Sequence, residues 1–219
     1  MLKSWLQRLF GKARAEPDQT VAAPQVDIIA DVRRQIEADV AGGFASEDEI
    51  ITAAVDVHGD DHGDPVALRR QACQIAAEAL QAHALKQAGW PEQTDCDRLD
   101  AAFAALEANG VISRQNFSCC GTCGSGEIWD EIDTAKEAGR PARGYTFYHM
   151  QDTESAVDGY GVYLNYGSCE EGPEAAVAIG HEIIAHLNQH DIQTEWDGQI
   201  EHRIAVSLDW KRRRQNLQA

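Results

Sequence analysis

The stretch that decides the fold is NGVISRQNFSCCGTCG, residues 109–124, because a helical pattern ends in it and a pattern of strands and turns begins. Asn109 and Gly110 are residue types that stop a helix. The run from Val111 to Phe117 predicts a short strand, and a tight turn rich in cysteine and glycine follows at 119–124. We therefore expect the architecture of the chain to change near residue 110.

Before this stretch, the sequence has the pattern of consecutive helices. Apolar residues recur at helical spacing, and glycine or proline stands at the end of each repeat. Ser46 with Glu49 forms a capping box, and Asp64 followed by Pro65 is an N-cap with a first-turn proline. The pattern predicts four helices: one that stops at Gly42, one near 47–57, one from Pro65 to Gly89 and one from Thr94 to Asn109.

After the cysteine turn, alternating runs predict strands separated by a helix. A helix is expected first, with Ser125 as its cap and Gly139 at its end. The predicted strands are 144–149, 161–166, 192–196 and 203–210, and a helix at 173–189 divides them into two pairs. The expected fold class is α+β: a helical N-terminal half followed by a mostly antiparallel sheet of β-β-α-β-β order with packed helices.

Residues 1–14 have an amphipathic and basic pattern. Four basic residues and no acidic one occur there, and the apolar side chains at helical spacing are Leu2, Trp5, Leu6, Leu9 and Phe10. A linker at 15–25 separates this expected helix from a helical region at 26–110 and an α+β region at 111–219 that contains the cysteine turn. We expect residues 1–14 to contact a membrane surface peripherally or to dock onto a groove of this chain or of a partner.

Composition and charge exclude several classes of protein. The 219-residue chain has 43% hydrophobic and 25% charged residues, and no apolar run approaches the roughly 20 residues that span a bilayer. Residues 1–14 and 211–214 hold eight of the 19 basic residues, which leaves eleven against 36 acidic ones, a net charge of −25. A body of this charge repels phosphate backbones, so no nucleic-acid partner is expected.

The cysteine turn is the densest chemical signal in the sequence. Cys120 and Cys123 form a C-x-x-C-G turn of the zinc-knuckle kind, in which two sulfurs converge on one ion. Cys119 is adjacent to Cys120 and is not expected to face the same ion easily, so a closed zinc site would have to recruit distant ligands, for which Cys169 and His149 are the candidates. Two alternatives remain open: a thiol redox pair near a helix start, and a structural turn in which cysteines pack as small hydrophobic side chains.

A second candidate site follows the predicted strand at 144–149. His149, Gln151, Asp152 and Glu154 stand where this strand ends, a position from which polar side chains can converge on a ligand. In the alternative interpretation, Asp152 or Thr153 caps a short helix and a hydrogen bond satisfies His149.

Three blocks of the sequence resemble an uncharacterised bacterial family, a domain of unknown function. They are the NF-x-CC-x-x-CG block at 116–124, residues Ile128 to Glu131, and residues 144–154, which end in YH-x-QDTE. The resemblance extends from about Asp27 to Arg213. It implies no activity, substrate or catalytic residue.

The sequence favours a binding protein over the common classes of enzyme. It contains no serine-nucleophile elbow, phosphate loop or dinucleotide fingerprint, and no secretory signal is recognised at residues 1–10. We expect a cytoplasmic binding or interaction module with a structural thiol or metal turn and an unknown protein or small-molecule partner, since cysteines stay reduced or metal-bound in that compartment. The alternative is a thiol-redox or metal-dependent enzyme that uses the turn at Cys119–Cys123.

Overall fold

The computed structural model describes residues 27–214 of the chain. The helix expected at residues 1–14 and the linker expected at 15–25 lie outside the described residues. In the described part, no helix is long and apolar enough to cross a membrane.

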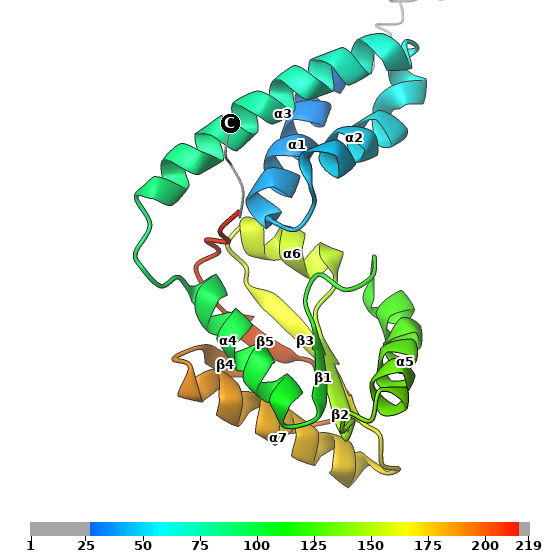
Figure 1. Cartoon of the computed structure of the whole chain (residues 1–219), viewed down its shortest axis with the longest axis vertical. Coiled ribbons are helices and arrows are strands. Elements are labelled where there is room, and N and C mark those ends of the chain that lie inside the picture. Colours follow the sequence, from blue (N-terminus) through cyan, green and yellow to red (C-terminus); the bar gives the residue numbers. More distant parts are fainter. Residues whose placement is uncertain (1–26, 215–219) are drawn as a thin grey trace, which may run out of the picture.

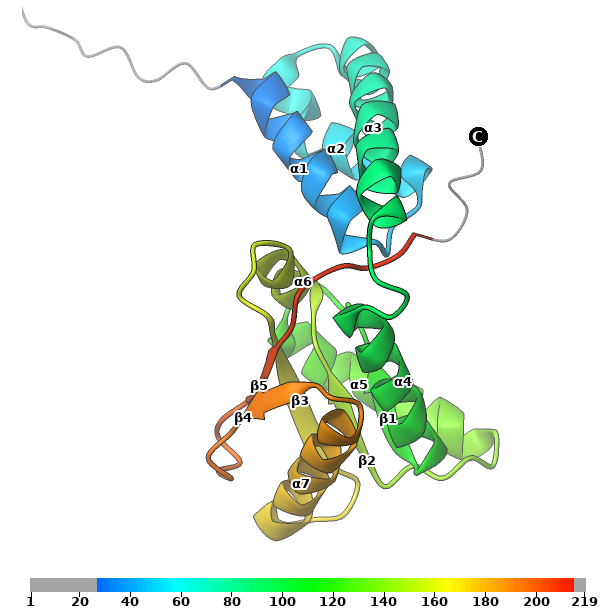
Figure 2. The ribbon, with the colours of Figure 1, turned by 90° about the vertical axis from the view of Figure 1, so that its left-hand side faces the viewer.

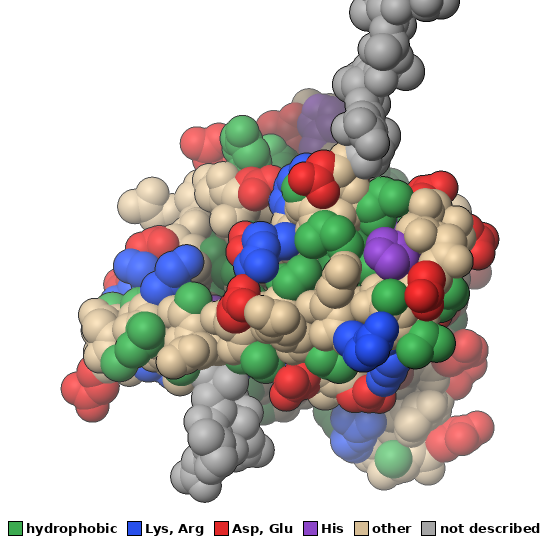
Figure 3. Space-filling model, turned by 90° about the horizontal axis from the view of Figure 1, so that it is seen from above, with side chains coloured by type: hydrophobic (Ala, Val, Ile, Leu, Met, Phe, Trp, Pro, Cys, Tyr) green, Lys and Arg blue, Asp and Glu red, His purple; other side chains and the backbone are tan. Residues whose placement is uncertain are grey.

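The first three helices pack on one another at one end of the molecule (Figures 1 and 2). They are α1 (Ile28–Gly42), α2 (Glu47–His62) and α3 (Pro65–Ala88), and they begin after the capping residues Asp27, Ser46 and Asp64. Buried aliphatic side chains from all three helices, such as Ile36, Ile50 and Leu68, form one core. Viewed from this end, hydrophobic side chains lie exposed between acidic and basic ones (Figure 3).

Helix α2 is longer than the sequence predicts. The expected end was near residue 57, whereas α2 continues to His62 and stops at Gly63, whose φ of 76° suits glycine. Gly59 is buried, and a Cβ placed on it would lie 3.8 Å from the Pro65 side chain. Gly59 thus lies close to the start of α3, and α2 continues through a segment whose composition alone resembles a loop.

A five-stranded sheet forms the second half of the structure. Its strands are β1 (Val111–Arg114), β2 (Gly144–Phe147), β3 (Val162–Ser168), β4 (Gln193–Glu195) and β5 (Ile204–Ser207), in the order β1-β2-β3-β5-β4. The β1–β2 pair is parallel and the other three pairs are antiparallel. The predicted α+β class with a mostly antiparallel sheet is therefore confirmed.

Helices cover both faces of the sheet. Helices α4 (Asp95–Ala108) and α7 (Pro173–Gln189) pack on the face that carries Val111 and Leu164. Helix α5 (Gly121–Glu137) packs on the opposite face, against Ile112 and Phe147. The period of two along a strand separates neighbours such as Val111 and Ile112 onto these two cores.

One helix was expected only in the alternative interpretation of residues 149–154, as a short helix capped by Asp152 or Thr153. Helix α6 (Met150–Val157) lies between β2 and β3 and contacts α1, so it joins the three-helix end to the sheet (Figure 1). It has eight residues, and its apolar periodicity is too short to distinguish it from a loop.

The chain after β5 returns to the three-helix end (Figure 2). A strand was expected to reach residue 210, but β5 ends at Ser207, and residues 208–214 run on without regular structure. Trp210 donates its indole hydrogen bond to the carbonyl of Ala41 at 3.0 Å, and Arg214 donates to the carbonyls of Val40 and Ala45. We call residues 208–214 the C-terminal strap.

Candidate metal-binding site

The cysteine cluster, Cys119, Cys120 and Cys123, follows a short loop with unusual backbone geometry. Asn116 and Ser118 have φ values of 50° and 61°, in the left-handed region that non-glycine residues seldom adopt. The Thr153 hydroxyl bonds Asn116 Oδ1 at 2.7 Å, and the Met150 amide donates to the Ser118 carbonyl at 3.1 Å. Contacts with α6 thus hold this strained loop in place.

Helix α5 begins five residues earlier than the sequence predicts. Cys120 occupies the N-cap position and the helix runs from Gly121, whereas Ser125 was the expected cap. A Cβ on Gly124 would come within 2.5 Å of the Phe147 ring, so the absence of a side chain lets this first turn lie against β2. Cys123 therefore lies inside the first turn of α5 rather than ahead of it.

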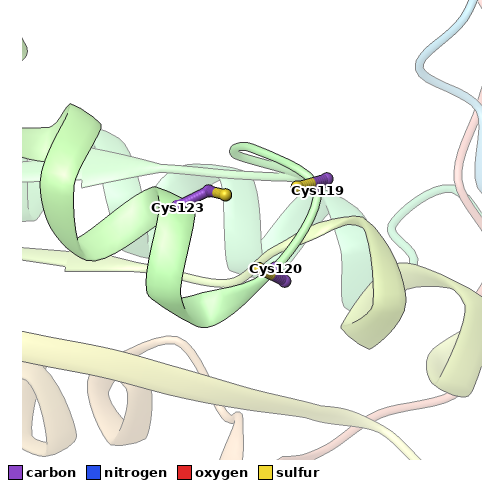
Figure 4. Close-up of side chains that lie close together, drawn as sticks. All are labelled: Cys119, Cys120 and Cys123. Carbon is purple, nitrogen blue, oxygen red and sulfur yellow. The ribbon is translucent and has the colours of Figure 1, made fainter.

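The three sulfur atoms of the cluster converge. The Sγ atoms of Cys119, Cys120 and Cys123 all lie within 4.8 Å of one another, and no other Cys, His, Asp or Glu among residues 27–214 joins the group at that distance (Figure 4). Cys119 and Cys123 are exposed and Cys120 is partly exposed. The structural alternative, in which these side chains pack as buried hydrophobic groups, does not match this exposure.

The local hydrogen bonds shift the pKa values of Cys120 and Cys123 in opposite directions. The backbone amide of Cys123 is the main cause that lowers the pKa of Cys120, and the Cys123 thiol and the Thr122 amide act in the same direction. Hydrogen bonding to Cys119 and then to Cys120 raises the pKa of Cys123 to about 11. Of these two thiols, Cys120 is therefore the one on which a negative charge is more stable, and it lies at the positive end of the α5 dipole.

His149 lies near the cluster, but other contacts hold it. It is the N-cap of α6, where its Nδ1 accepts from the Asp152 amide at 3.3 Å, and its Nε2 lies 3.1 Å from Asp152 Oδ2. A Cβ on Gly121 would be 3.7 Å from His149 Nε2. Burial is the main cause that lowers the pKa of His149, so its neutral form is favoured in this position.

The residues of the second candidate site do not converge, because two of their side chains are buried and two are exposed to solvent. His149 and Asp152 are buried and form the capping box, and Asp152 also accepts from Arg203 at 2.6 Å. Gln151 and Glu154 are exposed. The structure thus places a cap at His149, where the alternative interpretation expected Asp152 or Thr153.

Cys169 lies away from the cysteine cluster. Its amide donates to the carbonyl of Arg143, just before β2, and its side chain packs on the core that contains Ile132 and Phe147. Burial raises the pKa of Cys169, and Lys136, near the C-terminal end of α5, lowers it. The cluster stands at the opposite end of α5, so Cys169 is not brought together with it.

Two residues beside the site were missed in the sequence. Asn165 of β3 and Arg203, which precedes β5, follow the β3–β5 register as cross-strand neighbours, and Asn165 Nδ2 and Arg203 Nε are buried without a hydrogen-bond partner in the structure. A Cβ on Gly121 would lie 3.6 Å from Asn165 Oδ1. Only the strand register reveals this pair, because the two residues are far apart in sequence.

Comparison with known proteins gives one match. A family model described as "Domain of unknown function (DUF6891)" matches residues 25–214, a range that contains the cysteine cluster and helix α6. No curated protein matches the chain, and no solved structure does. The resemblance to an uncharacterised family that the sequence blocks indicated is confirmed by this match.

Proposed function

This chain belongs to the DUF6891 family, a domain of unknown function, and we propose from the geometry of its cysteine cluster that it is a binding protein for a thiophilic metal ion such as zinc. The observation that carries the proposal is the approach of three sulfur atoms to within 4.8 Å of one another at the protein surface. Two sulfurs bound to one tetrahedral zinc ion at about 2.3 Å stand about 3.8 Å apart. Small rotations of the exposed side chains would bring the cluster to that distance.

The proposed site has three thiolate ligands and one open position. All six cysteines and all eight histidines lie within residues 27–214, so the described part contains every thiol and imidazole ligand of the sequence. His149 is engaged by Asp152 on both ring nitrogens, and Cys169 lies at the other end of α5. We therefore assign the fourth position to water or to a ligand from outside the chain, and not to these two residues.

The electrostatic surroundings suit bound thiolates. The N-terminal amides of α5 stabilise negative charge on Cys120, as the direction of its pKa shift indicates. The pKa of Cys123 is high because its thiol donates hydrogen bonds to Cys119 and Cys120, and because negative charge on these neighbours repels a second charge. A divalent cation removes that repulsion, so metal binding displaces the protons.

The proposal is tested by the metal content of the full chain, purified without an affinity tag or a chelator. We expect about one equivalent of metal per chain and, after exchange for Co²⁺, an absorption band from sulfur-to-metal charge transfer. Cys120→Ser should abolish both signals. Cys73→Ser is the matched control, because Cys73 is an exposed cysteine on α3, outside the cluster.

Two results together would overturn the metal proposal. One is a metal content well below about 0.1 equivalent after incubation with zinc. The other is free reaction of Cys119, Cys120 and Cys123 with a thiol reagent in the presence of zinc, while the fold persists.

Thiol–disulfide exchange is the second candidate function, and the start of α5 favours it. Cys120 is the N-cap, with a lowered pKa, and Cys123 follows in the first turn. In this chemistry the Cys120 thiolate attacks a substrate disulfide and releases one thiol; Cys123, after losing its proton, attacks Cys120 Sγ and releases the second. The chain is left with a Cys120–Cys123 disulfide, the substrate has gained two electrons, and an external dithiol must restore the thiols.

The exchange candidate is tested by thiolate absorbance against pH in the metal-free chain. We expect one thiol to ionise below the unperturbed value of about 8.5, and this step should disappear in Cys120→Ser. A first midpoint at or above the unperturbed value would remove the basis for calling Cys120 a nucleophile.

We further propose that the protein acts in the cytoplasm, where a reducing environment keeps the cysteines available as ligands. The partner class is a protein or small molecule that supplies the fourth ligand. The net charge of −17 argues against nucleic acid as that partner.

A further inference from the structure

A groove lies apart from the cysteine cluster, where α2 and α6 flank α1. Its cavity volume is about 490 Å³, within the range of about 300–1,000 Å³ that is usual for binding sites. The residues that line it include Ala38 and Asp39 of α1, Val57 of α2, and Glu154 and Asp158 at α6. We call this the α1/α2/α6 groove.

The groove contains exposed apolar surface. Val57 is 62% exposed, whereas Ile50 and Ile51 of the same helix, α2, are buried in the three-helix core. Val57 and Ala38 therefore present a hydrophobic floor to the cavity that no residue among 27–214 fills.

The groove also contains acidic groups that lack a basic partner. Among residues 27–214, no Lys or Arg nitrogen forms an ion pair within 4.0 Å of Asp39, Glu154 or Asp158, whereas Asp31 pairs with Arg34 at 2.7 Å. Four carboxylates and one guanidinium line the cavity, a net charge of −3. Burial raises the pKa of Asp39, and the charge of Glu154 raises it further, although Arg214 opposes this.

The chain carries a segment that complements this surface in charge and hydrophobicity. Residues 1–14 have four basic residues and no acidic one, and their apolar residues recur at helical spacing. They are attached directly upstream of α1, whose first turn includes Asp31 of the groove. Residues 15–26 can span about 40 Å when extended, whereas α1 is about 22 Å long, so the segment can reach the whole groove.

We propose that residues 1–14 bind the α1/α2/α6 groove of the same chain. The apolar residues, Trp5 among them, contact Val57 and Ala38, and the basic residues pair with Asp39, Glu154 and Asp158. Attachment in the same chain gives the segment an effective concentration of about millimolar, higher than that of a second copy under ordinary conditions. An anionic membrane is disfavoured, because the chain apart from residues 1–14 has 15 basic and 36 acidic residues, and this net charge of −21 is repelled from it.

The first test is zero-length cross-linking of the full chain with a carbodiimide, which joins lysine amines to carboxylates. We expect cross-links from Lys3 or Lys12 to Asp39, Glu154 or Asp158, and their loss at about 1 M salt, where the Debye length falls to about 3 Å. A mixture of ¹⁴N- and ¹⁵N-labelled protein distinguishes cross-links within a chain from those between chains. Cross-links that join a ¹⁴N-labelled chain to a ¹⁵N-labelled chain would overturn the proposal. Cross-links spread evenly over carboxylates far from the groove would overturn it as well.

The second test follows the environment of Trp5 in full-length variants, by difference from Trp5→Phe in each background. We expect Trp5 to be protected from acrylamide in the unmodified chain. In Glu154→Lys/Asp158→Lys, quenching should rise to the level of a synthetic peptide of residues 1–14. The matched control is Glu174→Lys/Glu195→Lys, which makes the same charge change at exposed positions outside the groove and should leave Trp5 protected.

A charge swap completes the test. Lys3→Glu/Arg8→Glu in the Glu154→Lys/Asp158→Lys background should restore protection of Trp5, because opposite charges then face each other again. If Trp5 is as accessible in the unmodified chain as in the peptide, the proposal is wrong. If Trp5 is protected from acrylamide only when anionic vesicles are added, residues 1–14 bind the membrane, and the proposal that they bind the groove is wrong.

Discussion

At the scale of single residues, Gly124 sets the position of the cysteine cluster. A Cβ at this residue would stand 2.5 Å from the Phe147 ring, closer than real contacts allow. We expect Gly124→Ala to cost about 1–3 kcal/mol in the free energy of unfolding, because either the ring or the first turn of α5 must move. Urea denaturation followed by circular dichroism measures the change.

Gly126 provides the control for this substitution. It lies two residues further along α5, it is exposed, and nothing within 4 Å would meet an added Cβ. Gly126→Ala should leave the protein as stable or stabilise it by up to about 1 kcal/mol, because alanine has the higher helix propensity. Equal destabilisation by the two substitutions would contradict the packing explanation.

The thiol acidities predict how metal binding depends on pH. Because the pKa of Cys123 is raised to about 11, this thiol keeps its proton in the metal-free chain at neutral pH. A metal ion must displace that proton, so zinc affinity should rise between about pH 6 and pH 8. Calorimetry in buffers of different ionisation enthalpy should detect at least one proton released per ion, and an affinity independent of pH would contradict the proposed ligand set.

At the scale of secondary structure elements, α6 depends on an unusual cap. His149 accepts from the Asp152 amide, and Asp152 Oδ2 accepts from the His149 amide at 3.1 Å. His149→Ala should destabilise the protein by about 0.5–2 kcal/mol, whereas His149→Asn keeps a capping acceptor and should cost less. Thermal unfolding at about pH 7 compares the two variants.

The same cap predicts a dependence of stability on pH. Burial lowers the pKa of His149 in the folded state below its unfolded value of about 6.5, so the unfolded state binds more protons in that range. The contribution of neutral His149 to the free energy of unfolding is complete above a pH of about 6.5. It declines as the pH falls from there toward the lowered pKa of His149 in the folded state. His149→Asn should lose less stability than the unmodified chain between about pH 7 and pH 5; identical slopes would show that another group titrates.

At the scale of the whole molecule, the C-terminal strap connects the three-helix end to the α+β part. Arg212 is 14% exposed, donates to Asp100 of α4 at 3.1 Å and lies 4.1 Å above the Phe44 ring in the loop between α1 and α2. Arg212→Ala should cost about 1–3 kcal/mol, because it removes a charged hydrogen bond and leaves Asp100 without that partner. Relative to the unmodified chain, the exchange of backbone amide hydrogens should accelerate more in α1–α3 than in β3 and β5.

Arg140 is the control for the strap. Its guanidinium is 50% exposed and lies 3.7 Å from Glu107, so Arg140→Ala should change stability by no more than about 0.5 kcal/mol. Equal acceleration of exchange in both halves of Arg212→Ala would show that the strap stabilises the fold generally rather than joining its two ends.

The sequence by itself determined the features that depend on neighbouring residues. The capping box at Ser46 and Glu49, the N-cap at Asp64 and the start of a helix at Thr94 were predicted and are confirmed, because a cap and its helix are only a few residues apart. The convergence of the C-x-x-C sulfurs is local in the same way. The α+β class followed from the change of hydrophobic period near residue 110.

Only the tertiary structure decided features that join distant residues. The first turn of α5 lies so close to the Phe147 ring that only glycine fits at residue 124, and α2, which packs on α3, continues to His62. The sheet order places Cys169 at the far end of α5, and the packing of α6 on α1 brings Glu154 beside Asp39. Strand register and helix packing decide which distant side chains share a site, and the local periodicity of the sequence does not encode either of them.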